Sequence, residues 1–104
     1  MGTKIVALFN LKSNVSVEDY ENWEKTTDLP TVNGLASIDQ FEVFRVTGLL
    51  GTDAAAPYKY VEIIDVADME KFGADVATDT MQKVAGEFQA MADDLIFLMT
   101  DKLG

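Results

Sequence analysis

The chain has 104 residues, 48% of them apolar and 25% charged, and its formal net charge is −10 at pH 7. This composition predicts one globular domain spanning residues 1–104, while the excess of acidic groups disfavours binding to nucleic acid or to an anionic membrane surface. The longest apolar run, Ile5 to Phe9, is too short to span a bilayer, so we expect a cytoplasmic protein with no membrane segment.

The first part of the chain predicts a strand followed by a helix. Lys4 to Lys12 begins with a continuous apolar run, which is typical of a strand covered on both faces. Ser16 and the acidic Asp19 three residues later form a capping-box signal for a helix start. The helix is predicted to run to about Asp28 and to end at Leu29-Pro30, because the residue before a proline disfavours the α region.

The predicted helix has one face directed toward the sheet. Residues at intervals of three and four share that face, and they are Val17, Tyr20, Trp23 and Thr27. Charged residues are predicted to lie mostly outside it, and these are Glu18, Glu21, Glu24 and Lys25. The helix is therefore predicted to direct aromatic side chains toward the space between helix and sheet.

The rest of the chain predicts three more strands and a divided helical region. Ser37 to Thr47 alternates between polar and apolar residues, and a Gly- and Ala-rich loop from Gly48 to Pro57 leads to a strand from Tyr58 to Val66. A helical region with a break near Thr78-Asp79 follows, and Leu95 to Thr100 is the last strand.

The order of these elements, β-α-β-β-α-β, predicts an α+β, ferredoxin-like fold with a four-stranded antiparallel sheet. In this topology the first and third strands are central and the helices cover one face of the sheet. Several strand segments are nevertheless apolar on both faces, namely Ile5 to Phe9, Ile63-Ile64 and Leu95 to Met99. A second copy of the sheet is the simplest cover for the other face, so we predict a homodimer formed through the sheet faces.

The helix and the turn after it resemble small proteins of the dimeric α/β-barrel superfamily, in particular the REDY-like (HapK-type) and EthD-like proteins. The matching positions are Glu18-Asp19-Tyr20, Asn22-Trp23, Leu29-Pro30 and Gly34-Leu35. The tetrapeptide that gives the REDY-like proteins their name occurs here as Val17-Glu18-Asp19-Tyr20, with valine in place of arginine.

The resemblance implies a barrel built from two four-stranded sheets, with a small-molecule pocket between sheet and helices in each subunit. HapK-like proteins are associated with prodigiosin-type secondary metabolism, and related members include cofactor-free monooxygenases, lactone isomerases, aldoxime dehydratases and polyketide cyclases. EthD-type sequences often carry a histidine where this chain has Thr27. That difference argues against a histidine-based mechanism and against haem ligation.

Aromatic and polar side chains on the expected core face are candidates for ligand contact. The predicted substrate-binding residues are Tyr20, Trp23, Thr27, Tyr60 and Phe9. Packing of the hydrophobic core is the alternative role for the aromatic members, and both roles are compatible with one residue.

Glu62 and Arg45 are the candidates for catalysis. Glu62 interrupts a central strand on the same face as Tyr60, and a carboxylate there must be paired or must face a ligand. In a pocket its pKa would rise and it would serve as a general base. Otherwise it forms an ion pair with a strand neighbour, for which Arg45 is an obvious candidate, or it lies near a hydrated mouth of the barrel. Arg45 is either that structural partner or the anchor for a ligand carboxylate or enolate.

The chain contains neither cysteine nor histidine, which removes thiolate nucleophiles and the usual general base at neutral pH. The usual ligands of metal ions and haem are missing with them, so we expect no metal site. No glycine-rich phosphate-binding motif occurs, and we expect no cofactor. The leading hypothesis is a protein of secondary metabolism that binds an aromatic or polyketide-like metabolite and catalyses a cofactor-independent oxidation, isomerisation or condensation. The alternative is a non-catalytic metabolite-binding or assembly module that partners a biosynthetic enzyme.

Overall fold

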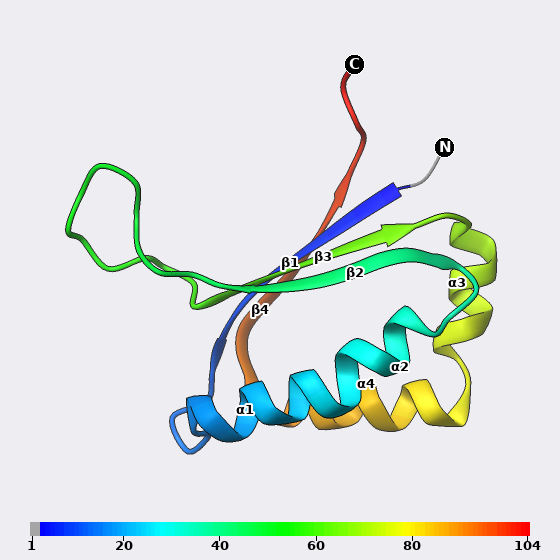
Figure 1. Ribbon diagram of the computed structural model, residues 1–104, viewed down its shortest axis with the longest axis horizontal. Helices are drawn as coiled ribbons and strands as arrows, with labels where there is room; N and C mark the ends of the chain where they lie inside the picture. The colour runs from blue at the N-terminus through cyan, green and yellow to red at the C-terminus, as the bar shows by residue number, and fades with distance from the viewer. Residues whose placement is uncertain (1–2) are drawn as a thin grey trace.

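The fold is organised around a single β-sheet in the computed structural model, which describes residues 3–104 (Figure 1). Its four strands are antiparallel and lie in the order β2-β3-β1-β4, so the first and third strands are central, as predicted. The strands are β1 (Thr3–Leu11), β2 (Ile38–Arg45), β3 (Tyr60–Val66) and β4 (Ala92–Thr100).

The helices lie together on one side of the sheet (Figure 1). They are α1 (Val17–Trp23), the π-helical turn η1 (Glu24–Asp28), α2 (Leu29–Asn33), α3 (Met69–Val76) and α4 (Asp79–Met91). Side-chain caps fix the starts of three of them: Ser16 accepts from the backbone N–H of Asp19, Asp68 begins α3 and Thr78 begins α4. The predicted break near Thr78-Asp79 is therefore confirmed, because α4 begins there. None of the helices within residues 3–104 has both the length and the apolarity needed to cross a bilayer.

The helical segment does not end at Leu29-Pro30, and this expectation from the sequence was wrong. The backbone N–H of Leu29 donates to the carbonyl of Glu24, so the chain passes through a π-helical turn and continues as α2 to Asn33. Pro30 then lies in the first turn of α2, where a missing N–H costs least.

The continued helix buries a row of residues at intervals of four, Tyr20, Glu24, Asp28 and Val32. The prediction that Glu24 lies outside the buried face was therefore also wrong, since only 3% of Glu24 is exposed.

The hydrophobic core between sheet and helices consists of two clusters rather than one. The first contains Ile5, Val32, Ile38, Phe41, Ile64, Val66 and Met81. The second contains Phe9, Tyr20, Tyr60, Phe88 and Ala92. Along β3 the two clusters are separated by the buried Glu62, which pairs with Ala7 of β1 and Val43 of β2. An acidic layer thus crosses the middle of the core.

The opposite face of the sheet is mainly apolar, and no helix of residues 3–104 covers it (Figure 1). The register and the alternation of the strands place the charged Lys4, Glu42 and Asp65 there, together with seven apolar side chains, namely Val6, Leu8, Phe44, Val61, Ile63, Ile96 and Leu98. Of these, Phe44 is 46% exposed and Leu98 is 44% exposed. The chain between β2 and β3 forms a long loop that projects from the sheet (Figure 1).

Candidate functional site

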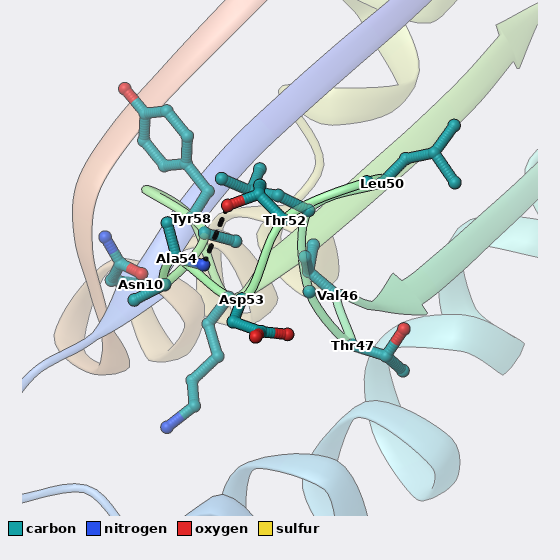
Figure 2. Close-up of a pocket in the computed structure, with 14 residues that line it drawn as sticks. Asn10, Val46, Thr47, Leu50, Thr52, Asp53, Ala54 and Tyr58 are labelled. Atoms are coloured by element: carbon teal, nitrogen blue, oxygen red, sulfur yellow. Dashed lines mark hydrogen bonds between the residues drawn. The ribbon is translucent and has the colours of Figure 1, made fainter.

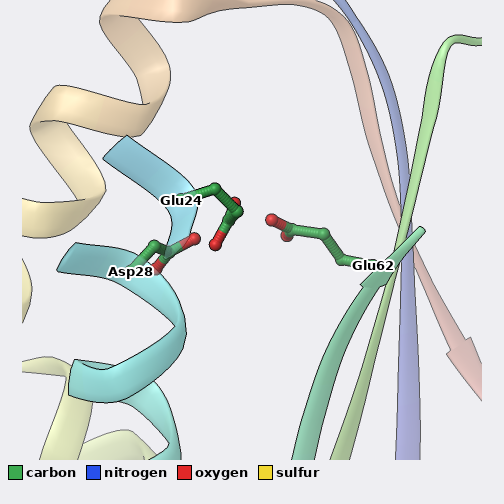
Figure 3. Close-up of side chains that lie close together, drawn as sticks. All are labelled: Glu24, Asp28 and Glu62. Carbon is green, nitrogen blue, oxygen red and sulfur yellow. The ribbon is translucent and has the colours of Figure 1, made fainter. Parts of the chain in front are cut away.

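Three carboxyl groups meet in the space between the sheet and the first helical segment. Glu24 and Asp28 project from η1, and Glu62 projects toward them from β3 (Figure 3). One oxygen from each lies within 4.8 Å of the others, and the three residues are only 3%, 5% and 4% exposed. We call this group the acidic cluster. Burying carboxyl groups side by side is costly unless something compensates for their lost hydration.

The protein supplies little of that compensation. Tyr20 donates its hydroxyl hydrogen to Oε1 of Glu24 over 2.7 Å. Oε2 of Glu24 and Oε2 of Glu62 are buried and have no hydrogen-bond partner among the described residues. No lysine or arginine within residues 3–104 forms an ion pair with the acidic cluster, since the one such pair found there joins Arg45 to Glu21.

This environment changes the protonation of the acidic cluster. Burial, with the nearby Asp28 carboxyl group as a second cause, raises the pKa of Glu62 to about 8. Burial also raises the pKa of Glu24, where Asp28 again adds to the effect, and burial raises the pKa of Asp28. Burial and the adjacent Glu24 raise the pKa of the Tyr20 hydroxyl. The acidic cluster therefore retains protons at neutral pH and is able to exchange them with a ligand.

A second polar group, made of Glu21, Arg45 and Tyr60, lies nearer the surface. Nε of Arg45 donates to Oε2 of Glu21 over 2.7 Å, and the Tyr60 hydroxyl donates to the same oxygen over 2.8 Å. The ion pair between Arg45 and Glu62, one of the alternatives from the sequence, is therefore wrong, because Arg45 lies exposed at the end of β2 and Glu62 lies in the core. Hydrogen bonds from Arg45 and Tyr60 lower the pKa of Glu21 to about 2.

Two cavities border the acidic cluster. The polar cavity, about 170 Å³, is lined by Tyr20, Glu21, Glu24, Lys25, Leu29, Val43, Arg45 and Tyr60. The phenylalanine cavity, about 110 Å³, has Asp28 and Glu62 in its wall, and its aromatic lining consists of Phe41, Phe72, Phe88 and Phe97. Glu24 faces the first cavity and its two partners face the second, so the acidic cluster forms the partition between them.

The predicted aromatic residues take different positions relative to these cavities. Tyr20 and Tyr60 line the polar cavity. Phe9 packs against Tyr60 with ring centroids 5.5 Å apart and is fully buried. Trp23 donates its indole N–H to Glu87 and stacks on Phe88. Phe9, Trp23 and Thr27 line neither cavity, so their role in binding stays a prediction.

Reasoning from the sequence missed Glu24 and Asp28. The signal that would have found them is the interval of four that connects Tyr20, Glu24, Asp28 and Val32. Three of these residues lie inside the predicted helix, but the interval of four competes there with the aromatic face of Tyr20, Trp23 and Thr27.

A larger concavity of about 960 Å³ lies under the loop between β2 and β3 and is lined mainly by residues 46–59 together with Asn10 (Figure 2). Its internal contacts are local, for example the hydrogen bond from the backbone N–H of Ala54 to Oγ1 of Thr52. Most of the lining residues are exposed, and none of the buried charged side chains faces it. We therefore place the candidate site at the acidic cluster.

The topology and the position of the acidic cluster define a ferredoxin-like α+β protein with a polar site between sheet and helices. A family model described as "REDY-like protein HapK" matches residues 3–103, and the chain belongs to this family. The crystal structure of HapK from Hahella chejuensis is 30% identical in sequence, with a TM-score of 0.79 over 98% of this chain and 93% of that chain.

More distant solved structures share the fold. A dimeric ferredoxin-like protein of unknown function from Thermobifida fusca is 19% identical, with a TM-score of 0.75 over 96% of this chain and 90% of that chain. A hydroxynitrile lyase from Passiflora edulis is 13% identical, with a TM-score of 0.78 over 95% of this chain and 91% of that chain. A comparison with curated proteins gives no match.

Proposed function

We propose that this HapK-family protein binds a small hydrophobic or aromatic metabolite between its sheet and its helices, and transforms it by acid–base chemistry at the acidic cluster. The reaction would be a cofactor-independent isomerisation or condensation, or an oxidation in which dioxygen as co-substrate accepts the electrons of the deprotonated ligand, in secondary metabolism. The observation that carries this proposal is the burial of three carboxyl groups without a basic partner among residues 3–104. Carboxyl groups with raised pKa values beside a cavity are typical of catalytic acids and bases.

The proposal assigns a separate task to each polar residue. Glu62 in its ionised form takes a proton from the bound ligand, and a protonated neighbour in the acidic cluster returns one to the product. Tyr20 holds Glu24 in place through its hydrogen bond. Arg45 and Tyr60 line the polar cavity on the other side of the acidic cluster, where they orient an oxygen on a part of the ligand that extends into that cavity and gains negative charge. The hydroxynitrile lyase of the same fold supports the idea that this architecture accommodates an enzyme acting on a small molecule.

We also propose that the protein acts as a homodimer formed through the open sheet face, and that it works in the cytoplasm. The apolar side chains on that face support the dimer, since a contiguous exposed apolar face usually marks an interface. The related fold from Thermobifida fusca, described as dimeric, is consistent with it. Sedimentation of the wild-type protein at micromolar concentration is expected to give a dimer, whereas Phe44→Glu, which places a charge on this face, is expected to give a monomer.

The catalytic proposal is tested by ligand discovery followed by product analysis. Aromatic and polyketide-like compounds are screened by thermal shift and native mass spectrometry, and each binder is then incubated with the protein. Glu62→Gln is expected to lower turnover by roughly 100-fold or more when the ligand is present at a saturating concentration, so that any change in affinity does not enter the comparison. Glu18→Gln, which removes the same charge from an exposed position of α1, is the matched control. Binding without conversion by the wild-type protein would replace this proposal with the non-catalytic binding module.

A further inference from the structure

The phenylalanine cavity has two chemically different ends. Most of its wall is apolar and includes the rings of Phe41, Phe72, Phe88 and Phe97. Its polar lining is acidic and consists of Asp28 and Glu62. A ligand that fills this volume must therefore place an apolar body against the phenylalanine rings and a polar head against the carboxyl groups.

The carboxyl groups determine the chemistry of that head. Oε2 of Glu62 and Oε2 of Glu24 are buried acceptors without a donor among the described residues, and both side chains point into the acidic cluster (Figure 3). The two residues are 96% and 97% buried, as their exposed fractions of 4% and 3% show. Such acceptors favour a ligand group that donates several hydrogen bonds and carries positive charge.

We infer that the phenylalanine cavity binds a small apolar or aromatic molecule through a protonated nitrogen, with the ammonium group at Asp28 and Glu62 and the apolar body among the phenylalanine rings. This inference rests on the proposed function and names the class of its ligand. An ammonium group has three N–H donors for the carboxyl oxygens. The electron-rich faces of nearby rings also attract a cation. A bound cation favours the ionised form of the carboxyl groups beside it, whereas a bound anion opposes their ionisation.

A divalent metal ion is the other cation that such a cluster suggests, and the surroundings fit it less well. Calcium takes six to eight oxygen ligands, whereas the carboxyl groups here adjoin apolar side chains such as Val32 and Phe41. One of the available oxygens, Oε1 of Glu24, already accepts from Tyr20. An apolar cavity of about 110 Å³ next to the acidic cluster has no use in holding a metal ion but accommodates the body of an organic cation.

The test compares three probes of similar size that differ in charge: benzylamine, benzyl alcohol and benzoate. Dissociation constants are measured at pH 7 by NMR titration of the full chain. Benzylamine is expected to bind about 10-fold or more tightly than benzyl alcohol, because hydrogen bonds between charged partners are the stronger class. Benzoate is expected to bind more weakly than the alcohol. Chemical-shift changes should map to β3, η1 and α4.

Two variants locate the effect. Glu62→Gln and, independently, Asp28→Asn are expected to weaken benzylamine about 10-fold while changing benzyl alcohol by less than about 2-fold. Glu18→Gln is the matched control and should change neither. Circular dichroism confirms that each variant is folded, and having two variants keeps the test valid if one of them fails to fold.

Each contrary outcome overturns the inference. Equal affinity for benzylamine and benzyl alcohol would show that the charged nitrogen does not contribute to binding, and would leave the proposed binding of an aromatic molecule intact. Failure of benzylamine to bind the folded wild-type protein would also overturn the inference. Binding of Mn²⁺ at micromolar concentration that excludes benzylamine would overturn it as well, because the acidic cluster would then be a metal site. Unchanged turnover in Glu62→Gln would count against the catalytic proposal and not against this one.

Discussion

Glu21 and Glu24 lie three residues apart on the same helical segment, yet their surroundings act on them in opposite directions. Glu21 accepts hydrogen bonds from Arg45 and Tyr60, and its pKa falls to about 2. Glu24 lies in the core beside Asp28 and Glu62, and its pKa rises. The first carboxylate stabilises the fold when it is ionised, whereas the second destabilises it. What decides between them is the presence of a basic partner and of water.

The contrast assigns different work to the two polar groups. The group of Glu21, Arg45 and Tyr60 fastens the helix to the edge of the sheet near the surface. The acidic cluster does not stabilise the packing of the helix on the sheet, because its members repel one another when ionised. A protein that retains such a group loses stability there, and such losses are usually found at functional sites.

The largest expected effect is the dependence of stability on pH. Because the pKa of Glu62 is about 8 in the folded protein and 4.5 as its ordinary value, the folded state holds more protons than the unfolded state between these values. The free energy of unfolding should therefore fall as pH rises from about 5 to 8, by roughly 2 to 4 kcal/mol. Urea unfolding at each pH measures this.

Below pH 4.5 the dependence of stability on pH is determined mainly by Glu21. The stability that Glu21 contributes is present above its ordinary pKa of 4.5 and is lost as pH falls through about 2. The two groups together predict greatest stability at mildly acidic pH. A free energy of unfolding that rises steadily from pH 5 to 8 would contradict the assignment of raised pKa values to the acidic cluster.

Glu62→Gln is expected to have the next largest effect. The amide is nearly isosteric, carries no charge and donates N–H groups toward Glu24 and Asp28, so the free energy of unfolding should rise by about 1 to 3 kcal/mol at pH 8. At pH 5, where Glu62 is protonated in the wild-type protein, the change should be close to zero. Glu18→Gln measures the effect of net charge alone and should lack this pH dependence.

Two tyrosine variants compare the polar groups directly. Tyr20→Phe removes the donor to the buried Glu24 and should lower the free energy of unfolding by about 1 to 2 kcal/mol at neutral pH. Tyr60→Phe removes a donor to Glu21, which still has Arg45 as a partner, and its cost should be smaller. Thermal unfolding of the two variants side by side gives the order, and a larger loss for Tyr60→Phe would reverse our ranking of the two groups.

The smallest expected effect on stability belongs to Arg45→Gln. Arg45 is 60% exposed, and exposed ion pairs contribute little to folding. The change should instead be visible in the titration of its partner, because the pKa of Glu21 should rise from about 2 toward its usual range. Carbon-detected NMR titration of the glutamate carboxyl groups measures this, and high salt should reduce the difference between wild type and variant.

Much of the fold was predictable because it depends on local patterns. Alternation in β2 places Phe41 on the helix side and Phe44 on the open side, and the polar residues Ser16 and Asp68 mark helix starts. The order of the strands in the sheet follows from the ferredoxin-like topology. Each of these inferences depends on residues close together in the chain or on a known arrangement of elements.

The candidate site was only partly predictable because it depends on the path of the helix and on contacts between distant elements. Glu62 was recognised as a charge in a central strand. Glu24 and Asp28 were missed because regular α-helical spacing assigned the inward face to Trp23 and Thr27, whereas a π-helical turn shifts that face to Glu24 and Asp28. The partner of Arg45 was misassigned because the choice between Glu21 and Glu62 depends on depth within the fold, which a sequence does not reveal.

The separation of the hydrophobic core into two clusters has a consequence for the motions of the protein. Apolar contacts transmit stability from one part of a domain to another, and a layer of mutually repelling groups weakens that transmission. The two ends of the molecule should therefore open to amide hydrogen exchange with different free energies. A positively charged ligand at the acidic cluster would couple the stabilities of the two clusters. Its binding should then slow amide hydrogen exchange at residues far from the ligand.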